Sequence, residues 1–196
     1  QAASQSYLYA WHRQAILELW PLIEHTGARR VLDLGSGEPP SYLATVLAKR
    51  GLDVTTLDLL AEANVKGDMH ELPLGDKTFD LVVARHVLEH SWAPFVALKE
   101  MLRVAPWGLV VVPDDCDKFL YWQGHFSILP RRQWEYLFWF TGWRIIYFES
   151  GDFGTSYAPN TEWRYLLKGE ASCLGPYDVD GHYVGKYRVL TIEGWQ

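Results

Sequence analysis

The chain has 196 residues, enough for one domain with a substantial core, and its 48% apolar residues argue against a disordered chain. Its formal net charge of −6 leaves no broad basic surface for phosphate backbones, so nucleic acid is not an expected partner. Two cysteines are too few for a disulfide framework, and no apolar run is long enough for a membrane helix, so we expect a cytoplasmic domain without a membrane partner.

The first half of the chain is predicted to alternate helices and strands. An amphipathic helix is expected over residues 6–23, lying across the ligand-binding edge of the sheet. The second and third strands are separated by residues 61–64 alone, which is too short for a crossover helix, so we expect a turn or loop there. The expected strands cover residues 29–35, 52–60 and 65–69, and a helix closed by Gly51 covers residues 41–51.

The second half continues the same alternation. Strands that are apolar throughout and alternate with helices predict an α/β fold, with a doubly wound, mainly parallel sheet and helices on both faces. The segment 116–129 is irregular and rich in aromatic residues. The expected strands cover residues 79–85, 108–115, 143–150 and 161–169, and the expected helices cover residues 93–105 and 130–141, the second with Pro130 at its first position.

The stretch "VLDLGSGEPP", residues 31–40, joins the first strand to the next helix through a turn with two glycines. Ligands of open parallel sheets bind at the carboxyl ends of the strands, where Asp33, Asp58 and Asp68 end the first three strands. Gly35 and Gly37 would let the backbone approach a ligand closely. The alternative is an ordinary tight turn with acids that cap loops.

A dinucleotide site is one possible reading of this turn. It requires Gly-x-Gly-x-x-Gly, because the pyrophosphate lies against the helix N-terminus. The third glycine of that pattern falls at Pro40, so the spacing disfavours a nicotinamide-dependent reductase.

"DLGSGEP" instead resembles the first motif of class I S-adenosylmethionine-dependent methyltransferases, Asp/Glu-x-Gly-x-Gly-x-Gly, from which it departs at Pro39. The stretch from "VKGDMHELPLGDKTFD" through "VLEH" to "LRVAPWGLVVV" resembles the central block of the type 11 members. The resemblance covers roughly residues 30–112. It implies a seven-stranded sheet with the order 3-2-1-4-5-7-6, and S-adenosyl-L-methionine as the cofactor.

The resemblance also assigns roles to individual residues. Asp33 would hold the methionine amino group, and Gly35, Ser36 and Gly37 would form the close-approach turn. S-adenosylmethionine carries no phosphate, so the turn does not need a third glycine.

The remaining cofactor contacts implied by the resemblance lie at the ends of later strands. Asp58 would accept the ribose hydroxyls, with Leu59 beside the adenine. Asp68 would meet the adenine amino group, Met69 would pack on the ring, and Arg85 would pass near the methionine part.

On this basis the chain is expected to be a single methyltransferase domain. Residues 1–29 would form the N-terminal helix, 30–112 the cofactor-binding half, 113–169 the acceptor-side half and 170–196 a C-terminal extension. In that extension residues 186–193 could add an edge strand. The expected reaction is methyl transfer to a small-molecule or glycan-type acceptor, more at oxygen than at nitrogen or carbon. The alternative is a non-catalytic domain of this fold that binds a partner protein.

A hydroxyl acceptor can require a general base, for which histidine is suited near neutral pH. His86 follows the fourth strand and His125 lies in the aromatic loop, so both are candidate catalytic residues, whereas His90 is expected to be structural. Aromatic side chains could line the acceptor pocket or pack in the core. They are Phe119, Tyr121, Trp122, Phe126, Trp134, Trp139 and Trp143, of which Trp134, together with Leu137 and Phe138, has helical spacing expected to face the sheet.

No metal is expected to take part in the reaction, although acids lie at the end of the fifth strand. Asp114 and Asp115 lie there, but the position after the fourth strand that would complete a divalent-cation site carries Arg85. A guanidinium repels a cation and pairs with a carboxylate instead.

Overall fold

The computed structural model describes residues 17–114, 124–152 and 161–170. Among these residues, no helix combines the length and apolarity needed to cross a membrane. The strands are β1 (Arg30–Leu34), β2 (Asp53–Asp58), β3 (Val65–Lys66), β4 (Leu81–Arg85), β5 (Trp107–Pro113), β6 (Trp143–Asp152) and β7 (Thr161–Gly169). The helices are α2 (Tyr42–Ala48), α3 (Pro94–Val104) and α4 (Arg131–Phe140), with a 3₁₀ turn η1 (Leu88–His90) and a helical segment at residues 17–25.

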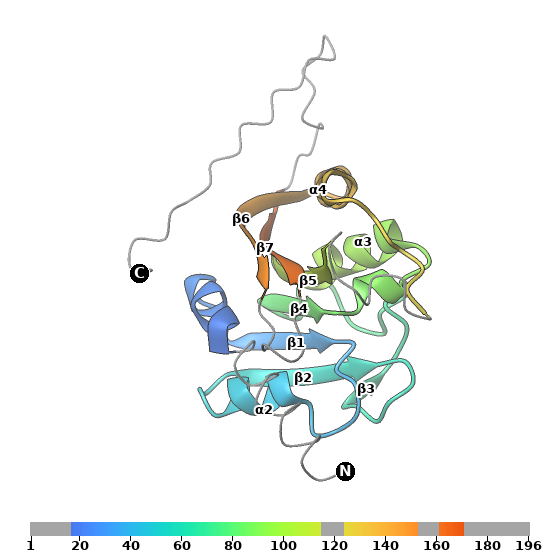
Figure 1. Cartoon of the computed structure of the whole chain (residues 1–196). Coiled ribbons are helices and arrows are strands. Elements are labelled where there is room, and N and C mark those ends of the chain that lie inside the picture. Colours follow the sequence, from blue (N-terminus) through green and yellow to red (C-terminus); the bar gives the residue numbers. More distant parts are fainter. Residues whose placement is uncertain (1–16, 115–123, 153–160, 171–196) are drawn as a thin grey trace, which may run out of the picture.

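The strands form one sheet with the order β3-β2-β1-β4-β5-β7-β6, which confirms the predicted topology. The first five strands are parallel, while β7 pairs antiparallel with both β5 and β6. The arrowheads of β1, β2 and β4 consequently point to the same edge of the sheet (Figure 1). The segments that follow these strands are brought together at that edge.

The central strands are buried on both faces, because their residues alternate between two core clusters. One cluster packs under residues 17–25 and α2, and the other packs under α3 and α4. Helices therefore cover both faces, as the sequence predicted. Alternation is visible in β1, where Val31 belongs to the first cluster and Leu32 and Leu34 to the second.

Some elements differ from the prediction in extent or place. β3 has two residues, because Asp68 and the residues after it leave the strand for a turn. Pro130 is the residue before α4 rather than its first, which agrees within one position. Residues 17–25 pack on a face of the sheet, not across its ligand-binding edge, because Leu19, Leu22 and Ile23 join the α2-side core. Residues 1–16, where the sequence predicts the start of the N-terminal helix, and the extension from residue 171 lie outside the described residues.

Candidate active site

The turn after β1 depends on two glycines in the left-handed region. Gly35 has φ +70° and Gly37 has φ +68°, values that L side chains rarely adopt. A Cβ at Gly35 would lie 2.3 Å from Cγ2 of Val87, whereas one at Gly37 would meet nothing within 4 Å. Gly35 is therefore required for packing against the segment after β4, and Gly37 for the shape of the turn alone.

Asp33, near the end of β1, is a buried acid aimed at the start of α2. Ser41, the N-cap of α2, donates its hydroxyl to Asp33 Oδ2 and accepts the backbone N–H of Ala44. Burial raises the pKa of Asp33 to about 6, although the Ser41 hydroxyl and the charge of Arg85 oppose the shift. Ionisation of this buried carboxyl group therefore costs free energy unless a cation binds next to it.

Asp58 ends β2 and organises the two neighbouring turns. Its Oδ2 accepts the N–H of Gly37 at 2.9 Å, and its Oδ1 accepts the N–H groups of Leu60 and Ala61 at 2.8 and 2.9 Å. Burial would raise the pKa of Asp58, but these backbone bonds outweigh it and lower the pKa. A permanently ionised carboxylate with further acceptor capacity therefore lies beside the glycine turn.

A pocket of about 350 Å³ opens between these elements. It brings together five of the residues singled out from the sequence, and the turn to α2 supplies the rest of its wall. Burial lowers the pKa of Arg85, while the carboxylates of Glu162, Asp33 and Glu89 oppose this, and the guanidinium stays protonated. The five predicted residues in the lining are Asp33, Gly35, Ser36, Gly37 and Arg85.

The remaining predicted cofactor residues do not line this pocket. Leu59 is an exposed apolar side chain, and Met69 is partly buried against the α3-side core. Asp68 accepts both the backbone N–H of His70 and, at 2.6 Å, its Nδ1, and the backbone bond lowers the pKa of Asp68. His70 Nε2 in turn lies 2.7 Å from the hydroxyl of Ser91, so Asp68 anchors a chain of hydrogen bonds.

His86 follows β4 in a strained conformation, with φ +51°. Its Nε2 lies 2.8 Å from Glu162 Oε2 on β7, and its Nδ1 lies 3.4 Å from Glu89 Oε1. Burial alone would lower the pKa of His86, but these two carboxylates outweigh it and raise the pKa. Both ring nitrogens therefore face acids, an arrangement that favours a protonated imidazolium over a general base.

Glu162 links His86 to a second buried cation. Its Oε1 accepts Arg164 Nε at 2.7 Å, and both side chains are fully buried. Burial would raise the pKa of Glu162, but the contact with His86 and the charges of Arg164 and Arg85 lower it to about 2. β7 thus contributes a charged network beneath the acceptor side of the sheet edge.

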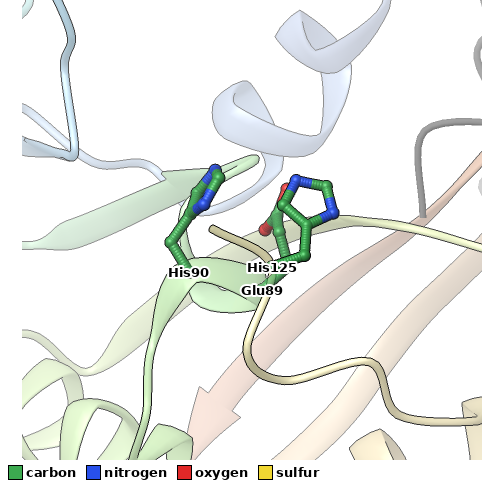
Figure 2. Close-up of side chains that lie close together, drawn as sticks. All are labelled: Glu89, His90 and His125. Carbon is green, nitrogen blue, oxygen red and sulfur yellow. The ribbon is translucent and has the colours of Figure 1, made fainter. Parts of the chain in front are cut away.

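His125 lies beside His90 and Glu89 at the same sheet edge (Figure 2). The centroids of the two imidazole rings are 4.7 Å apart with the rings at 72°. Of the aromatic residues proposed for an acceptor wall, Trp134 and Trp143 are buried in the core, as Trp134's helical spacing predicted, and Phe126 is exposed. Asp115, Phe119, Tyr121 and Trp122 lie outside the described residues.

Several residues of this site did not stand out in the sequence. Ser41 carried a usable signal, since a serine before an apolar helix is a typical N-cap. Glu89 and His90 belong to "LEH", but nothing local pairs them with His125. Glu162 lies 76 positions from His86, and no pattern in the sequence connects the two.

Comparison with known proteins supports the same family. Residues 32–112 match the family model described as a methyltransferase domain. No curated protein matches the sequence at a significant level.

Solved structures share the fold at low sequence identity. The 1,6-didemethyltoxoflavin-N1-methyltransferase of Burkholderia thailandensis, solved with S-adenosylhomocysteine, is 17% identical with a TM-score of 0.63, over 86% of this chain and 85% of that one. A putative sarcosine dimethylglycine methyltransferase of Galdieria sulphuraria is 14% identical with a TM-score of 0.63, over 81% and 85%. The [4+2]-cyclase SpnF is 15% identical with a TM-score of 0.65, over 81% and 82%.

These structures establish the fold, and the cyclase shows that the fold also serves a different described activity. The resemblance to this family therefore rests on the matched segment together with the sheet order and the glycine turn. Residues 32–112 are thus similar to a methyltransferase domain, in a chain whose fold is shared by S-adenosylmethionine-dependent methyltransferases of solved structure.

Proposed function

We propose that the chain is a class I S-adenosylmethionine-dependent methyltransferase that transfers a methyl group from S-adenosylmethionine to an oxygen of a small molecule, with glycan-type acceptors included. The observation that carries the proposal is the pocket in which Asp33, the glycine turn and Arg85 meet. Two described relatives of the fold act on small molecules, as their names state. The net charge of −6 supports an acceptor other than nucleic acid, and we place the reaction in the cytoplasm.

The residues around the pocket fit the cofactor. Asp33 would pair with the methionine ammonium, which supplies the cation that its buried carboxylate requires, and Arg85 would donate hydrogen bonds to the methionine carboxylate. Ser36 supports this assignment, because its hydroxyl is buried without a hydrogen-bond partner among the described residues and can meet a polar group of the ligand. Asp58 would hold the ribose hydroxyls while it keeps the turn closed through Gly37.

The adenine would lie along the turns after β2 and β3. Leu59 is exposed on one side, and Met69 lies on the other, next to Asp68. In this proposal Asp68 both meets the adenine amino group and anchors His70.

The bound cofactor supplies an electrophilic methyl group, and the protein's task is to align the acceptor with it. His86 is held between Glu162 and Glu89, so we assign it an electrostatic and positioning role instead of the general-base role predicted from sequence. Deprotonation of the acceptor hydroxyl is assigned to the His125 side of the site. The hydrogen bond that His90 Nδ1 donates to the carbonyl of Gly124 keeps that side in place.

Calorimetric titration of the full chain tests the cofactor assignment. We expect S-adenosylhomocysteine to bind and NADH not to bind. Asp58→Ala should weaken S-adenosylhomocysteine binding at least about tenfold, because it removes charge-assisted hydrogen bonds worth roughly 1.5–3 kcal/mol each. Glu62→Ala, a nearby exposed acid outside the pocket, is the matched control. Unchanged affinity in a folded Asp58→Ala variant would remove Asp58 from the site.

A further inference from the structure

Three potential metal ligands converge where η1 meets the loop at residues 124–127. Glu89, His90 and His125 each offer one ligand atom, and these atoms all lie within 4.8 Å of one another. Figure 2 shows the carboxylate of Glu89 next to the two imidazole rings. We call these three residues the Glu89 cluster.

The buried carboxylate of Glu89 is the strongest indication that a cation binds at this cluster. Its side chain is only 3% exposed, and one oxygen, Oε1, faces His86 at 3.4 Å. The other oxygen, Oε2, is buried and makes no hydrogen bond within the described part of the chain. A buried, unsatisfied carboxylate oxygen is costly, and a bound cation would satisfy it.

The backbone around the Glu89 cluster is already fixed. The carbonyl of Glu89 accepts the N–H groups of Phe126 and Ser127 at 2.8 and 3.0 Å, and the Ser127 hydroxyl donates to the Ser91 carbonyl at 2.6 Å. His90 Nδ1 donates to the carbonyl of Gly124 at 2.9 Å. These bonds tie the loop that carries His125 to η1, so ligands from both segments are held near one another.

The bond from His90 to Gly124 also fixes a tautomer. A carbonyl can only accept, so Nδ1 of His90 carries the proton and Nε2 keeps a free electron pair for a metal. Metal-binding histidines typically donate their second ring N–H to a backbone carbonyl or carboxylate in this way. This hydrogen bond is therefore of the kind that orients a histidine ligand in a metal site.

We propose that the Glu89 cluster binds a zinc-like divalent transition metal through Glu89, His90 and His125. Two imidazoles and one carboxylate suit zinc and its neighbours, whereas magnesium and calcium prefer oxygen ligands. Tetrahedral zinc with bonds of roughly 2.0–2.2 Å places its ligand atoms about 3.3–3.6 Å apart. The ligand atoms of the Glu89 cluster lie within 4.8 Å of one another, so side-chain rotation must shorten any distance that exceeds the zinc spacing. Three protein ligands leave a fourth position open.

This site differs from the expectation that no metal takes part. That expectation concerned Asp114 and Asp115 at the end of β5, where Arg85 argues against a cation. The Glu89 cluster draws its ligands from η1 and the loop at residues 124–127 instead. Resting on the proposed function, a metal held by these residues would lower the pKa of a bound acceptor hydroxyl, whose proton would leave to solvent water. His125 would then serve as a metal ligand in place of the base.

The test is equilibrium dialysis of the metal-stripped full chain against Zn²⁺, with Mg²⁺ as a comparison. We expect one tightly bound Zn²⁺ per chain and no Mg²⁺. His125→Ala and Glu89→Gln should each weaken Zn²⁺ binding at least about tenfold. His25→Ala is the matched control, because His25 packs on Trp107 at the amino end of β5. Co²⁺ substitution should give visible absorption in the native chain and in His25→Ala only.

His90→Ala is the decisive second variant. If His125 acted only as a general base, this substitution would not change Zn²⁺ binding, whereas the proposed site requires that binding be weakened. Thermal unfolding without metal shows which variants are folded, and His90→Gln replaces His90→Ala if the loop is disturbed. The proposal is overturned if the native chain binds no stoichiometric Zn²⁺. It is equally overturned if folded His90 and His125 variants bind Zn²⁺ as the native chain does. Neither outcome touches the cofactor assignment, because S-adenosylhomocysteine binding is measured separately.

Discussion

Asp33 concentrates the electrostatics of the cofactor pocket in one side chain. It is buried beside a serine hydroxyl and near a buried arginine, and its pKa is raised to about 6. The acid is therefore ionised above pH 6 and protonated below it. Asp58 and Asp68 have pKa values below their ordinary range, so they stay ionised down to more acidic pH.

This difference predicts a pH dependence of cofactor affinity. An ammonium ligand needs the ionised form of Asp33, which falls to about a tenth of the population one pH unit below its pKa. The dissociation constant of S-adenosylhomocysteine should consequently be about tenfold higher at pH 5 than at pH 7.5, measured by calorimetry. Asp33→Asn should bind more weakly and lose this slope. A flat profile for the native chain would mean that Asp33 does not meet the ammonium.

At the scale of elements, the turn between β1 and α2 requires its two glycines for different reasons. Both Gly35 and Gly37 have positive φ, but only Gly35 has a neighbour in the place of a Cβ. The sequence indicated the turn and its ligand edge, because glycine spacing reflects local backbone freedom. It could not distinguish the two glycines, since Val87 comes from a different strand connection.

The two glycines should therefore differ in their contribution to stability. Gly37→Ala introduces a left-handed alanine at a cost of about 1–2 kcal/mol in the free energy of unfolding. Gly35→Ala should cost more, because the added methyl also overlaps Val87, whose Cγ2 would be 2.3 Å away. Urea unfolding monitored by circular dichroism measures both. Equal losses would show that the segment after β4 moves freely away from the turn.

The rest of the site divides in the same way: features set by local sequence were predictable, and contacts between distant segments were not. The strand order and the acids at the ends of β1 and β2 followed from the residue pattern and the family resemblance. The partners of His86 did not, because Glu162 reaches it from β7 across the antiparallel end of the sheet. That contact raises the pKa of His86, which is why the proposal gives it an electrostatic and positioning role in place of the general-base role predicted from the sequence. Long-range pairing of this kind depends on tertiary register, which no local spacing reports.

Across the whole molecule, the α3-side core joins both halves of the chain. It runs from Leu32 and Leu57 near the cofactor turn to Trp134, Trp143 and Trp163 on the acceptor side. These three tryptophans are buried, and Trp20 and Trp107 pack against the other core cluster, so tryptophan fluorescence reports unfolding on both faces of the sheet. A continuous core between the halves favours cooperative unfolding, and the single domain stays a prediction that this unfolding would test.

If the chain unfolds cooperatively, a cofactor bound near β1 should also stabilise the part of the core that lies far from the pocket. S-adenosylhomocysteine at 100 times its dissociation constant should raise the free energy of unfolding by about 2.7 kcal/mol, because it binds only the folded state. Tryptophan fluorescence and far-ultraviolet circular dichroism should show the same shift in urea, although the ligand contacts β1 and β2. NADH at the same concentration should shift neither signal. If the ligand moved one of the two transitions and left the other in place, unfolding would not be cooperative and the prediction of a single domain would be wrong.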